Sequence, residues 1–566
     1  MPPLRFDTVD TALRAAASWP DSGLTFVDLS ERETSLEWAE LYVRARRAAG
    51  VLRALGVRAG DRVGLVLPTS PGFMDAFFGT LLAGGTPTPL CPPVRWGQLR
   101  EYHAVTARML RTIGARLVLT DRRLHKVLGQ TIESAGLDLT CHTADVLESE
   151  RDGELDERAR ADQIGLIQFS SGSTTDAKAV ALSHGQLMAQ CAALTALMPA
   201  QDETTHVGAS WLPLYHDMGL VGCLLTAVYY GHSRLVLIPP EHFAARPGLW
   251  LRAISRHQAV VAPAPNFAYG MCLKRVRDEE MVGVDLSCWR YALNGAETVS
   301  LDVMRRFGER FSRWGLSPNA LMPVYGLAEA ALAVTFSSST EALLGIAVDP
   351  VTLATTGDVV PGRREVASVG PPVPGFEVEV RDEHGTVLTE RRAGRIFARG
   401  PSVMIGYYDD DEATTRALVD GWLDTGDLGF VADGQLYVTG RVKDLVVIRG
   451  ANHTCQEFEE CLEGIAGVRS GCAVALGYAP PGAEGEQLLI LAERAPGRDP
   501  ASDPALIEQI RAAVLGRTAI RPHTVHILRM RSLPRTSSGK VRRAEALRRF
   551  IEGELVIARQ PLAEMG

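Results

Sequence analysis

Apolar and polar positions along the first 440 residues follow two alternating patterns. Longer stretches place apolar side chains at helical spacing, and the stretch from Gly72 to Leu82 predicts a helix. Between such stretches stand short continuous apolar runs, which predict buried strands at residues 63–67, 117–120 and 234–238. The alternation of buried strands with helices predicts an α/β fold with mixed sheets.

A further helix is predicted by an amphipathic run that ends at Leu55. Thr34 and Glu37 have the spacing of a capping box ahead of this run, and Gly56 is a typical residue to end a helix. We therefore expect the helix to begin just after Thr34.

The pattern changes near Gly421, where glycine-punctuated segments predict antiparallel hairpins. Asp433-Gly434 is a turn dipeptide between two such strands. We place a boundary at residues 441–444, because about 120 residues with strand and helix patterns of their own follow it. The expected organisation is a large unit over 1–440 and a small α+β unit over 445–566.

Composition and charge narrow the functional classes. Hydrophobic residues make up 46% and charged residues 22% of the 566 residues, as in ordinary globular proteins. A net charge of -8 argues against a nucleic-acid partner, since such partners are bound by basic surfaces. No long apolar stretch predicts a membrane span and no secretory leader is evident, so we expect a cytoplasmic protein. The nine cysteines show no metal-ligand spacing and are expected to be free thiols.

Basic residues are distributed unevenly in type and in place. Of the 59, only five are lysine, at 126, 178, 274, 443 and 540, which marks positions where a mobile ammonium differs usefully from a guanidinium. Between Arg521 and Phe550, nine basic residues stand against one acid, Glu545. This stretch predicts a local basic patch.

A hydroxyl-rich turn follows a predicted strand in the segment LIQFSSGSTTDAKAV, residues 166–180. Ser171, Ser173 and Thr174 supply donors around Gly172, and Lys178 adds a positive charge, which together suit the phosphates of a nucleotide. The second glycine of a Walker A loop is missing, so the segment is not a P-loop. By itself, such a turn is also compatible with an ordinary surface loop.

The interpretation of this turn depends on six further sequence blocks that follow it in a fixed order. With the turn included, the seven blocks are FSSGSTTDAKAV (169–180), SWLPLYHDMGL (210–220), NGAE (294–297), YGLAEA (325–330), WLDTGDLG (422–429), GRVKDLVVIRGANH (440–453) and PRTSSGK (534–540). Their wording and order resemble the adenylate-forming superfamily of acyl-CoA synthetases, luciferase and peptide-synthetase adenylation domains, and within it the fatty acyl-AMP ligases. The resemblance spans most of the chain and implies a large N-terminal domain with mixed sheets and a small mobile C-terminal domain.

The resemblance also implies that ATP and Mg²⁺ are bound by residues of these blocks. The expected nucleotide-binding residues are Ser171, Gly172, Ser173, Thr174, Lys178, Asn294, Gly295, Ala296, Glu297, Tyr325, Gly326, Asp427 and Arg441. Among them, Tyr325 would stack on adenine, and Asp427, assisted by Arg441, would accept the ribose hydroxyls. Glu329 would hold Mg²⁺, which prefers carboxylate and phosphate oxygens. Taken singly, each of these residues is also compatible with a structural role.

Three residues are expected to act in catalysis. Lys540 would place an ammonium between the substrate carboxylate and the α-phosphate, where attack brings two anions together. Lys443 matches the family's hinge at 441–444, about which the C-terminal domain would swing between adenylation and thiol transfer. His216 with Asp217 is similar to a gate at the mouth of an acyl pocket, although a hydrogen-bonded core pair is equally compatible.

Three features favour the fatty acyl-AMP ligase branch: Ala328, the LYHDMG wording and the long connection from Ala331 to Ser368. In the resemblance, this connection restrains domain motion and disfavours coenzyme A. The acyl group of a fatty acid then passes to the phosphopantetheine thiol of a separate acyl carrier protein, in natural-product or lipid biosynthesis. Because carrier proteins are acidic, the basic stretch with Arg521, Arg542 and Arg543 is an expected docking surface.

The chain departs from the family pattern at several positions, and other functions stay open. The departures are Thr175, Ala177 and Ala179 in the phosphate loop and Thr454-Cys455 after the hinge. One alternative is an acyl- or aryl-CoA ligase that uses free coenzyme A. A second is an amino-acid-adenylating enzyme in which Asp217 pairs with the substrate ammonium. A third is an inactive homologue that binds nucleotide or a carrier protein without turnover.

Overall fold

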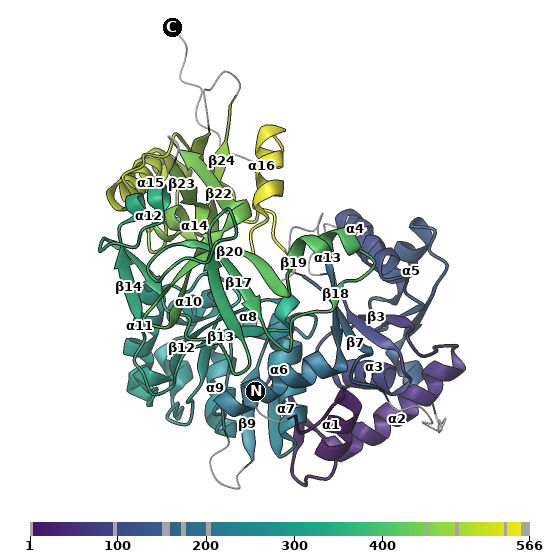
Figure 1. The fold of residues 1–566 in the computed structure, drawn as a ribbon. Helices are drawn as coiled ribbons and strands as arrows, with labels where there is room; N and C mark the ends of the chain where they lie inside the picture. The colour runs from purple at the N-terminus through teal and green to yellow at the C-terminus, as the bar shows by residue number, and fades with distance from the viewer. Residues whose placement is uncertain are drawn as a thin grey trace.

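The computed structural model describes residues 4–93, 99–149, 159–170, 177–199, 205–448, 451–480, 486–536 and 540–555. A large domain of mixed sheets and helices forms the lower part of the molecule in Figure 1, and a smaller C-terminal domain lies above it. The α/β class predicted from the sequence is confirmed. Within the described part of the chain, no helix has the length and apolar character needed to cross a membrane.

The first sheet of the large domain is mostly parallel. Its strands run in the order β2 (Glu33–Glu37), β1 (Gly23–Val27), β10 (Ser233–Leu237) and β9 (His206–Ser210). Bridges through Val261 and Ala264 continue it toward β11 (Ala292–Asn294), β12 (Leu321–Gly326) and β13 (Ala333–Phe336). The carboxyl ends of β9 and β12 lie at the same edge of this sheet, because β11 and the bridges that connect the two strands are all parallel.

The second sheet lies against the first across a shared core. Its parallel part has the order β4 (Thr86–Pro89), β3 (Arg62–Val66), β5 (Leu117–Thr120) and β6 (Thr140–Thr143). Beside β4 lies an antiparallel group of β7 (Ile164–Phe169), β8 (Ala179–Ser183) and β18 (Gly406–Tyr407). Apolar side chains of both sheets meet those of α2 (Trp38–Ala54), α3 (Pro71–Leu82) and α6 (His184–Leu197) in one hydrophobic core. That burial is the main force that holds the large domain together.

Other helices flank these sheets. They are α1 (Val9–Ala16), α4 (Leu99–Thr112), α5 (His125–Ser134), a π-helix η3 (Met218–Leu225) continued by α7 (Thr226–Tyr230), α8 (Pro240–Ala245), α9 (Gly248–His257), α10 (Asn266–Arg275), α11 (Leu301–Phe311) and α13 (Asp411–Ala417). Several begin at side-chain caps. At the start of α6, for example, the Ser183 hydroxyl accepts from the backbone of Gln186 and the Gln186 side chain accepts from Ser183.

A third, antiparallel sheet carries the chain toward the C-terminal domain. It contains β16 (Glu377–Arg381), β17 (Gly394–Arg399), β19 (Leu418–Val419), β20 (Trp422–Ala432) and β21 (Gln435–Arg441). Asp433 and Gly434 join β20 to β21 with positive φ angles of 53° and 71°, as the predicted Asp-Gly hairpin requires. The connection before this sheet forms β14 (Gly345–Val348), α12 (Pro350–Thr356) and β15 (Arg364–Ala367).

The predicted elements are found with one correction. The predicted strands correspond to β3, β5 and β10, and the helix expected from Gly72 to Leu82 corresponds to α3. The helix expected after Thr34 instead begins at Trp38, and Glu37 makes no side-chain cap. Thr34 and Glu37 belong to β2, which pairs antiparallel with β1. Pairing with a strand of the core therefore overrides the local capping signal.

The C-terminal domain has its own sheet and its own cores. Antiparallel β22 (Leu445–Ile448) and β23 (Ala451–Thr454) precede a sheet with the order β24 (Val468–Tyr478), β25 (Gln487–Arg494) and β26 (Thr524–Leu528). Its helices are α14 (Cys455–Glu460), α15 (Asp503–Thr518) and α16 (Arg543–Ile551). Side chains of α14 and α15 form one hydrophobic cluster with the sheet and Ala546 of α16 joins another, so helices cover both faces.

We expect Trp250→Ala to lower the free energy of unfolding of the large domain by about 3–5 kcal/mol, measured by urea denaturation. Trp250 is fully buried and meets Trp289, Phe243 and Tyr269 edge to face, so truncation leaves a cavity. The matched control is Trp19→Ala, because Trp19 is 38% exposed. Equal losses for the two variants would contradict this account of the core.

Candidate functional site

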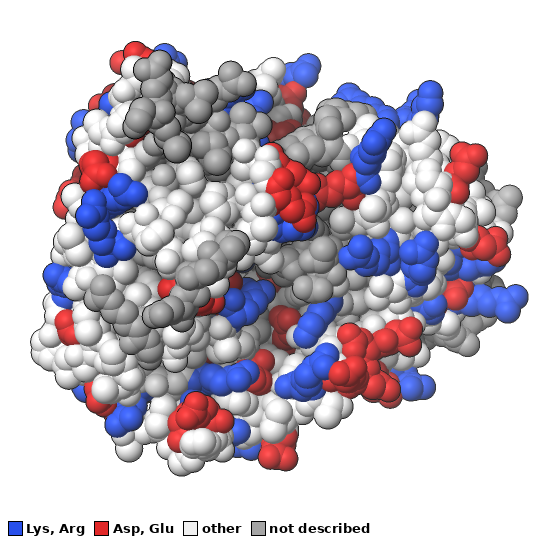
Figure 2. Space-filling model, turned by 90° about the horizontal axis from the view of Figure 1, so that it is seen from above, with Lys and Arg blue, Asp and Glu red and all other residues white. Residues whose placement is uncertain are grey.

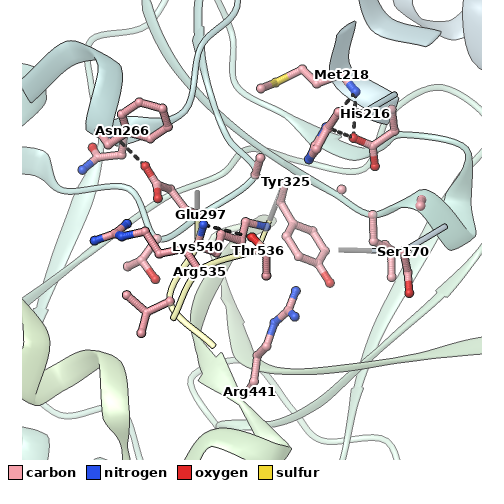
Figure 3. Close-up of a pocket in the computed structure, with 18 of the residues that line it drawn as sticks. Ser170, His216, Met218, Asn266, Glu297, Tyr325, Arg441, Arg535, Thr536 and Lys540 are labelled. Carbon is pink, nitrogen blue, oxygen red and sulfur yellow. Dashed lines mark hydrogen bonds and ion pairs between the residues drawn. The ribbon is translucent and has the colours of Figure 1, made fainter. Parts of the chain in front are cut away.

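A continuous cavity of about 2770 Å³ lies between the large domain and the C-terminal domain. Single small-molecule pockets are typically about 300–1,000 Å³, so there is room for more than one substrate. Described residues of all seven sequence blocks line the cavity, including His216, Tyr325, Asp427 and Arg441, together with Lys540 of the C-terminal domain. Figure 3 shows Lys540 entering from the C-terminal chain toward Glu297, with Tyr325 and Arg441 facing the same space.

Tyr325, Asp427 and Arg441 line this cavity and contact one another. The Tyr325 hydroxyl donates to Asp427 Oδ2 at 2.7 Å, and Arg441 Nε lies 2.9 Å from Asp427 Oδ1. Asp427 and Arg441 are register partners in β20 and β21, which explains how they meet. Burial, and then the Asp427 carboxylate, raise the pKa of Tyr325 well above its ordinary value, so the hydroxyl stays a donor.

Gly326 follows Tyr325 at a point where no side chain fits. A Cβ built on Gly326 would lie 1.7 Å from the Leu332 carbonyl oxygen, because β12 and β13 approach closely at their irregular pairing. Position 326 therefore requires glycine, which lets the chain pass close to Leu332 between Tyr325 and Glu329.

The residues 294–297 form a tight turn at the carboxyl end of β11. Asn294 is fully buried, and its amide donates to Asn266 Oδ1 at 3.1 Å. Neither Asn294 nor Gly295 lines the cavity, whereas Ala296 and Glu297 do. Ala296 has a φ of 66°, which is unusual for a residue with a side chain and marks a constrained turn. The structure thus brings two of these four residues to the cavity wall and leaves two beneath it.

Glu297 is a partly buried acid on that wall. One of its carboxylate oxygens accepts from the backbone N–H of Phe267 at 2.6 Å. Burial raises the pKa of Glu297 above its ordinary value, although Lys540 and Arg535 counteract part of the effect.

Glu329, Tyr407 and Lys178 form a second connected group. The Tyr407 hydroxyl donates to Glu329 Oε1 at 3.0 Å, and Lys178 Nζ lies 4.3 Å from the centre of the Tyr407 ring. Burial raises the pKa of Glu329. Among the residues that the structure describes, no three potential metal ligands cluster. One carboxylate beside a cavity fits Mg²⁺, which usually binds few protein groups and completes its shell with phosphate and water.

The hydroxyl-rich turn is described only at its two ends. Ser171, Gly172, Ser173 and Thr174, with the departure Thr175, lie outside the described residues. At the ends, the Ser170 N–H donates to the Lys178 carbonyl at 2.9 Å and the Lys178 N–H donates to Ser170 Oγ at 3.2 Å. Lys178 and Ala177 line the cavity, and Ala179 starts β8.

His216 and Asp217 stand at the start of η3. His216 Nδ1 lies 2.6 Å from Asp217 Oδ1, and Asp217 also accepts from the backbone of Met218 at 2.7 Å. Burial by itself would raise the pKa of Asp217, but His216, Met218 and Lys540 together lower it below its ordinary value. Both residues line the cavity, so the pair is not confined to the core.

Lys540 is held by a short hairpin of the C-terminal domain. The Lys540 N–H donates to Thr536 Oγ1 at 3.0 Å, and the Thr536 N–H donates to the Lys540 carbonyl at 2.7 Å. Burial, followed by the charge of Arg441, lowers the pKa of Lys540, while Glu297, Asp217 and Asp427 act in the opposite direction. The ammonium is therefore within electrostatic reach of acids from three separate blocks of the large domain.

Lys443 lines the same cavity two residues beyond Arg441. It lies in η8 (Val442–Asp444), the one-turn helix between β21 and β22. Burial and then the charge of Arg441 lower the pKa of Lys443.

An apolar part of the cavity extends along β9, away from His216. It is lined by side chains of α6, η3, α7, β9 and β10, among them Leu194, Cys223, Ala227 and Leu235. His206, at the start of β9, stacks on Tyr230 with ring centroids 4.3 Å apart. His206 and Ser210 are four residue steps apart along β9, or about 13 Å at about 3.3 Å per step. We call this part the apolar pocket, although the side chains of His206 and Arg234 also line it.

The sequence matches a known protein family. The model of the AMP-binding enzyme family matches residues 13–408, which is more than half of the chain. The chain belongs to the AMP-binding enzyme family.

Relatives of this AMP-binding enzyme cover almost its whole length. A Caulobacter vibrioides protein provisionally named acyl-CoA synthetase is 35% identical, over 97% of this chain and 96% of the other. The medium-chain-fatty-acid–[acyl-carrier-protein] ligase of Moorena producens and the long-chain-fatty-acid–AMP ligase of Mycolicibacterium smegmatis are each 31% identical, over 94% of this chain and 92% of theirs.

Solved structures agree with these relatives. A structure from work on fatty acyl-adenylate ligases of E. coli and L. pneumophila superposes with a TM-score of 0.91 at 33% identity, covering 97% of this chain and 99% of the other. The fatty acid AMP ligase of Legionella pneumophila superposes with a TM-score of 0.72 at 28% identity, covering 98% of both chains. The chain is thus an adenylate-forming ligase, which activates a carboxylic acid with ATP.

Some site residues of this AMP-binding enzyme were not predicted from the sequence. Tyr407 reaches Glu329 and Lys178 because β18 pairs with β8, with Tyr407 opposite Val180. More than 200 residues separate the two strands along the chain, so no local signal marks Tyr407. The residues of the apolar pocket also carry no motif, because their role depends on which side of a helix or strand faces the cavity.

The structure gives no support to the expected docking surface at Arg521, Arg542 and Arg543. Arg542 is 6% exposed and pairs with Glu101 of the large domain, and Arg543 pairs with Asp444 and Glu459 at 2.8 Å and 2.6 Å. Arg521 remains accessible but lies 3.5 Å from Glu508. Figure 2 shows basic and acidic side chains interspersed on the face seen from above. Two of the three arginines are used inside the molecule, so the basic patch predicted from the sequence is largely neutralised.

Proposed function

We propose that this enzyme converts a fatty acid and ATP to an acyl-AMP and pyrophosphate, and then transfers the acyl group to the phosphopantetheine thiol of a separate acyl carrier protein. The observation that carries the proposal is the position of Lys540. The C-terminal domain places Lys540 in the same cavity as Glu297, Asp217, Asp427 and Arg441. This arrangement suits the first of the two steps.

In that step, a carboxylate oxygen of the acid attacks the α-phosphorus of ATP. A carboxylate–phosphorus bond forms, the bond from the α-phosphorus to the bridging oxygen breaks, and pyrophosphate leaves. No protein nucleophile is needed, so the protein contributes by orientation and by stabilising negative charge. Lys540 would lie between the two anions and offset their repulsion.

The other groups fit the remaining parts of the nucleotide. The ring of Tyr325 would stack on adenine, and Ala296 and Glu297 would line its edge. Asp427, oriented by Tyr325 and Arg441, would accept the ribose hydroxyls. The hydroxyl-rich turn with Lys178 would bind the β- and γ-phosphates, and Glu329 would hold Mg²⁺, which would neutralise charge on the phosphates.

The apolar pocket along β9 supports a fatty acid as the substrate. The pocket opens beside His216, whose partner Asp217 is within electrostatic reach of Lys540. From there it extends between apolar side chains of α6, α7 and β10. An amino acid would present its ammonium near this opening, where the Asp217 carboxylate is already paired with His216 and Met218. The apolar lining therefore favours an alkyl chain over an amino acid.

The contacts of the connection Ala331–Ser368 support a carrier protein as the acceptor. Arg364 of β15 is 6% exposed and lies 3.2 Å from Glu460 and 3.7 Å from Glu457, both of α14. Helix α12 also lies against β23 (Figure 1). Buried charge pairs resist separation, because a charge left without its partner is costly. These contacts would restrict rotation of a domain over 445–566 about a hinge at 441–444. Restricted rotation is what the resemblance associates with a carrier protein, rather than free coenzyme A, as the thiol acceptor.

An acyl-CoA ligase is the second candidate function, since one relative carries the name acyl-CoA synthetase. The two candidates differ only in the thiol acceptor. An experiment that offers both acceptors therefore decides between them.

We expect purified enzyme with ATP, Mg²⁺ and fatty acids of several lengths to accumulate acyl-AMP when only coenzyme A is present, and to consume it when a holo carrier protein is added. Mass spectrometry of both the nucleotide and the thiol products measures this, with apo carrier protein as the control. Rapid formation of acyl-CoA would establish the second candidate instead.

We expect Ala227→Phe to shift the preferred fatty acid to a shorter chain. Ala227 is partly exposed to the apolar pocket, so a phenyl ring there would block its depth. The specificity constant for the preferred long acid should fall about tenfold or more, while that for a short acid changes less, as measured by pyrophosphate release. Unchanged chain-length preference would mean that the acyl group lies elsewhere.

We expect the adenylation rate to fall with increasing pH, as the pH rises through the lowered pKa of Lys540. Only the protonated ammonium stabilises the anions, and burial with Arg441 makes it lose its proton at a lower pH than an ordinary lysine. Arg441→Gln removes one of these causes, so the alkaline limb of kcat should move to higher pH even though the rate itself falls. A limb that stays in place in this variant would contradict the assignment to Lys540.

A further inference from the structure

One ion pair connects the Lys540 hairpin directly to the large domain. Arg542, two residues after Lys540, pairs with Glu101 in the first turn of α4, and Arg549 of α16 lies 3.5 Å from the same carboxylate. In Figure 1, α16 lies on the side of the C-terminal domain toward α4, while α12 lies on the opposite side. The two edges of the interface are thus held by different charge pairs.

The hairpin that carries Lys540 moves with Arg542. The Arg542 N–H donates to the Pro534 carbonyl at 2.9 Å, and Arg535 bridges Val541 across the hairpin. The Thr536 and Lys540 backbones are also bonded to each other. A displacement of Arg542 relative to the large domain therefore displaces the ammonium of Lys540 in the cavity.

The neighbouring Arg543 has a different connection. Its guanidinium bonds to Asp444 and Glu459, which lie beyond β21 on the side of the C-terminal domain. Arg543 thus secures the start of α16 to its own domain, whereas Arg542 crosses to the other. If the C-terminal domain turns away from α4, the pairs of Arg542 and Arg549 with Glu101 are broken, whereas those of Arg543 are kept.

The guanidinium of Arg542 is almost entirely removed from solvent, whereas its partner carboxylate is partly exposed. The side chain of Arg542 is 5% exposed, and that of Glu101 is 39% exposed. Charge pairs near such a surface interact more strongly than pairs in bulk water, and a buried guanidinium without its partner is costly. Loss of Glu101 would therefore reduce the population of the arrangement in which Lys540 reaches the reacting groups.

We propose that Glu101 is a positioning residue for the adenylation step: through Arg542 and Arg549 it holds the Lys540 hairpin in the cavity, and it does not serve thiol transfer. The proposal rests on the proposed role of Lys540 and on the domain rotation that the resemblance implies. It assigns to α4, outside all seven sequence blocks, a function in the first half-reaction.

The test compares the two half-reactions in Glu101→Gln. Adenylation is measured as pyrophosphate release with saturating fatty acid and ATP, and transfer as single-turnover loss of supplied acyl-AMP to holo carrier protein. We expect kcat for adenylation to fall about tenfold with KM for ATP within about twofold, and transfer to be unchanged or faster. Glu101→Asp, which keeps the charge, should retain more adenylation than Glu101→Gln.

A charge exchange separates positioning from a general structural role. Glu101→Arg should lower adenylation further, because three guanidinium groups would meet, and adding Arg542→Glu should recover part of the loss. The matched control is Asp145→Asn, which removes the exposed pair with Arg122 in the same domain and should leave both half-reactions unchanged. Thermal unfolding of every variant shows whether the fold is kept.

Several results would overturn the proposal: equal loss of adenylation and transfer, no loss in Glu101→Gln, or no recovery in the charge exchange. Lys540→Ala, measured in parallel, separates this failure from failure of the proposed function. If Lys540→Ala retains wild-type adenylation, Lys540 does not act in adenylation, and the positioning role of Glu101 is then also contradicted. If Lys540→Ala is inactive while the Glu101 variants adenylate normally, only the positioning role is wrong.

Discussion

The active arrangement depends on one ammonium group, brought into a cavity of one domain by a loop of another. Lys540 is surrounded there by the charges of Asp217, Glu297, Asp427 and Arg441, and burial lowers its pKa. A lysine in such a place is stable only if acidic groups oppose the cost of desolvation. The three acids come from separate segments of the large domain: Asp217 caps η3, Glu297 follows β11 and Asp427 lies within β20. The charge balance therefore exists only while the two domains are together.

The domain interface is therefore part of the site. Arg364 joins β15 to α14 at one edge, and Arg542 joins the Lys540 hairpin to α4 at the other. Both guanidinium groups are nearly buried, so each contributes to a specific domain orientation more than an exposed pair would. The same contacts that place Lys540 for adenylation must loosen for thiol transfer if the C-terminal domain rotates, which links the choice of acceptor to the strength of this interface.

Local patterns in the sequence were enough for the strands β3, β5 and β10, the helix α3 and the hairpin at Asp433-Gly434. They failed at Thr34 and Glu37, where antiparallel pairing with β1 outweighs a capping signal. For the site, the order of the seven blocks identified residues that the structure brings to one cavity, while Asn294 and Gly295 lie beneath its wall. Tyr407 was missed because it reaches Lys178 through a strand pairing distant along the chain. The docking role predicted for Arg542 is not supported, because this side chain pairs with Glu101. Glu101 lies 441 residues away along the chain, and no pattern in the sequence predicts such a pair.

The most direct measurement of the central claim is an experimental structure of the enzyme with a non-hydrolysable acyl-adenylate bound. The account predicts that Lys540 Nζ lies about 3 Å from oxygens of the acyl-phosphate linkage. It also predicts that the Tyr325 ring lies on adenine, that Asp427 lies at the ribose and that the acyl chain extends along β9. An adenylate bound with Lys540 turned out to solvent, while the C-terminal domain keeps its contacts with α4 and β15, would contradict the account.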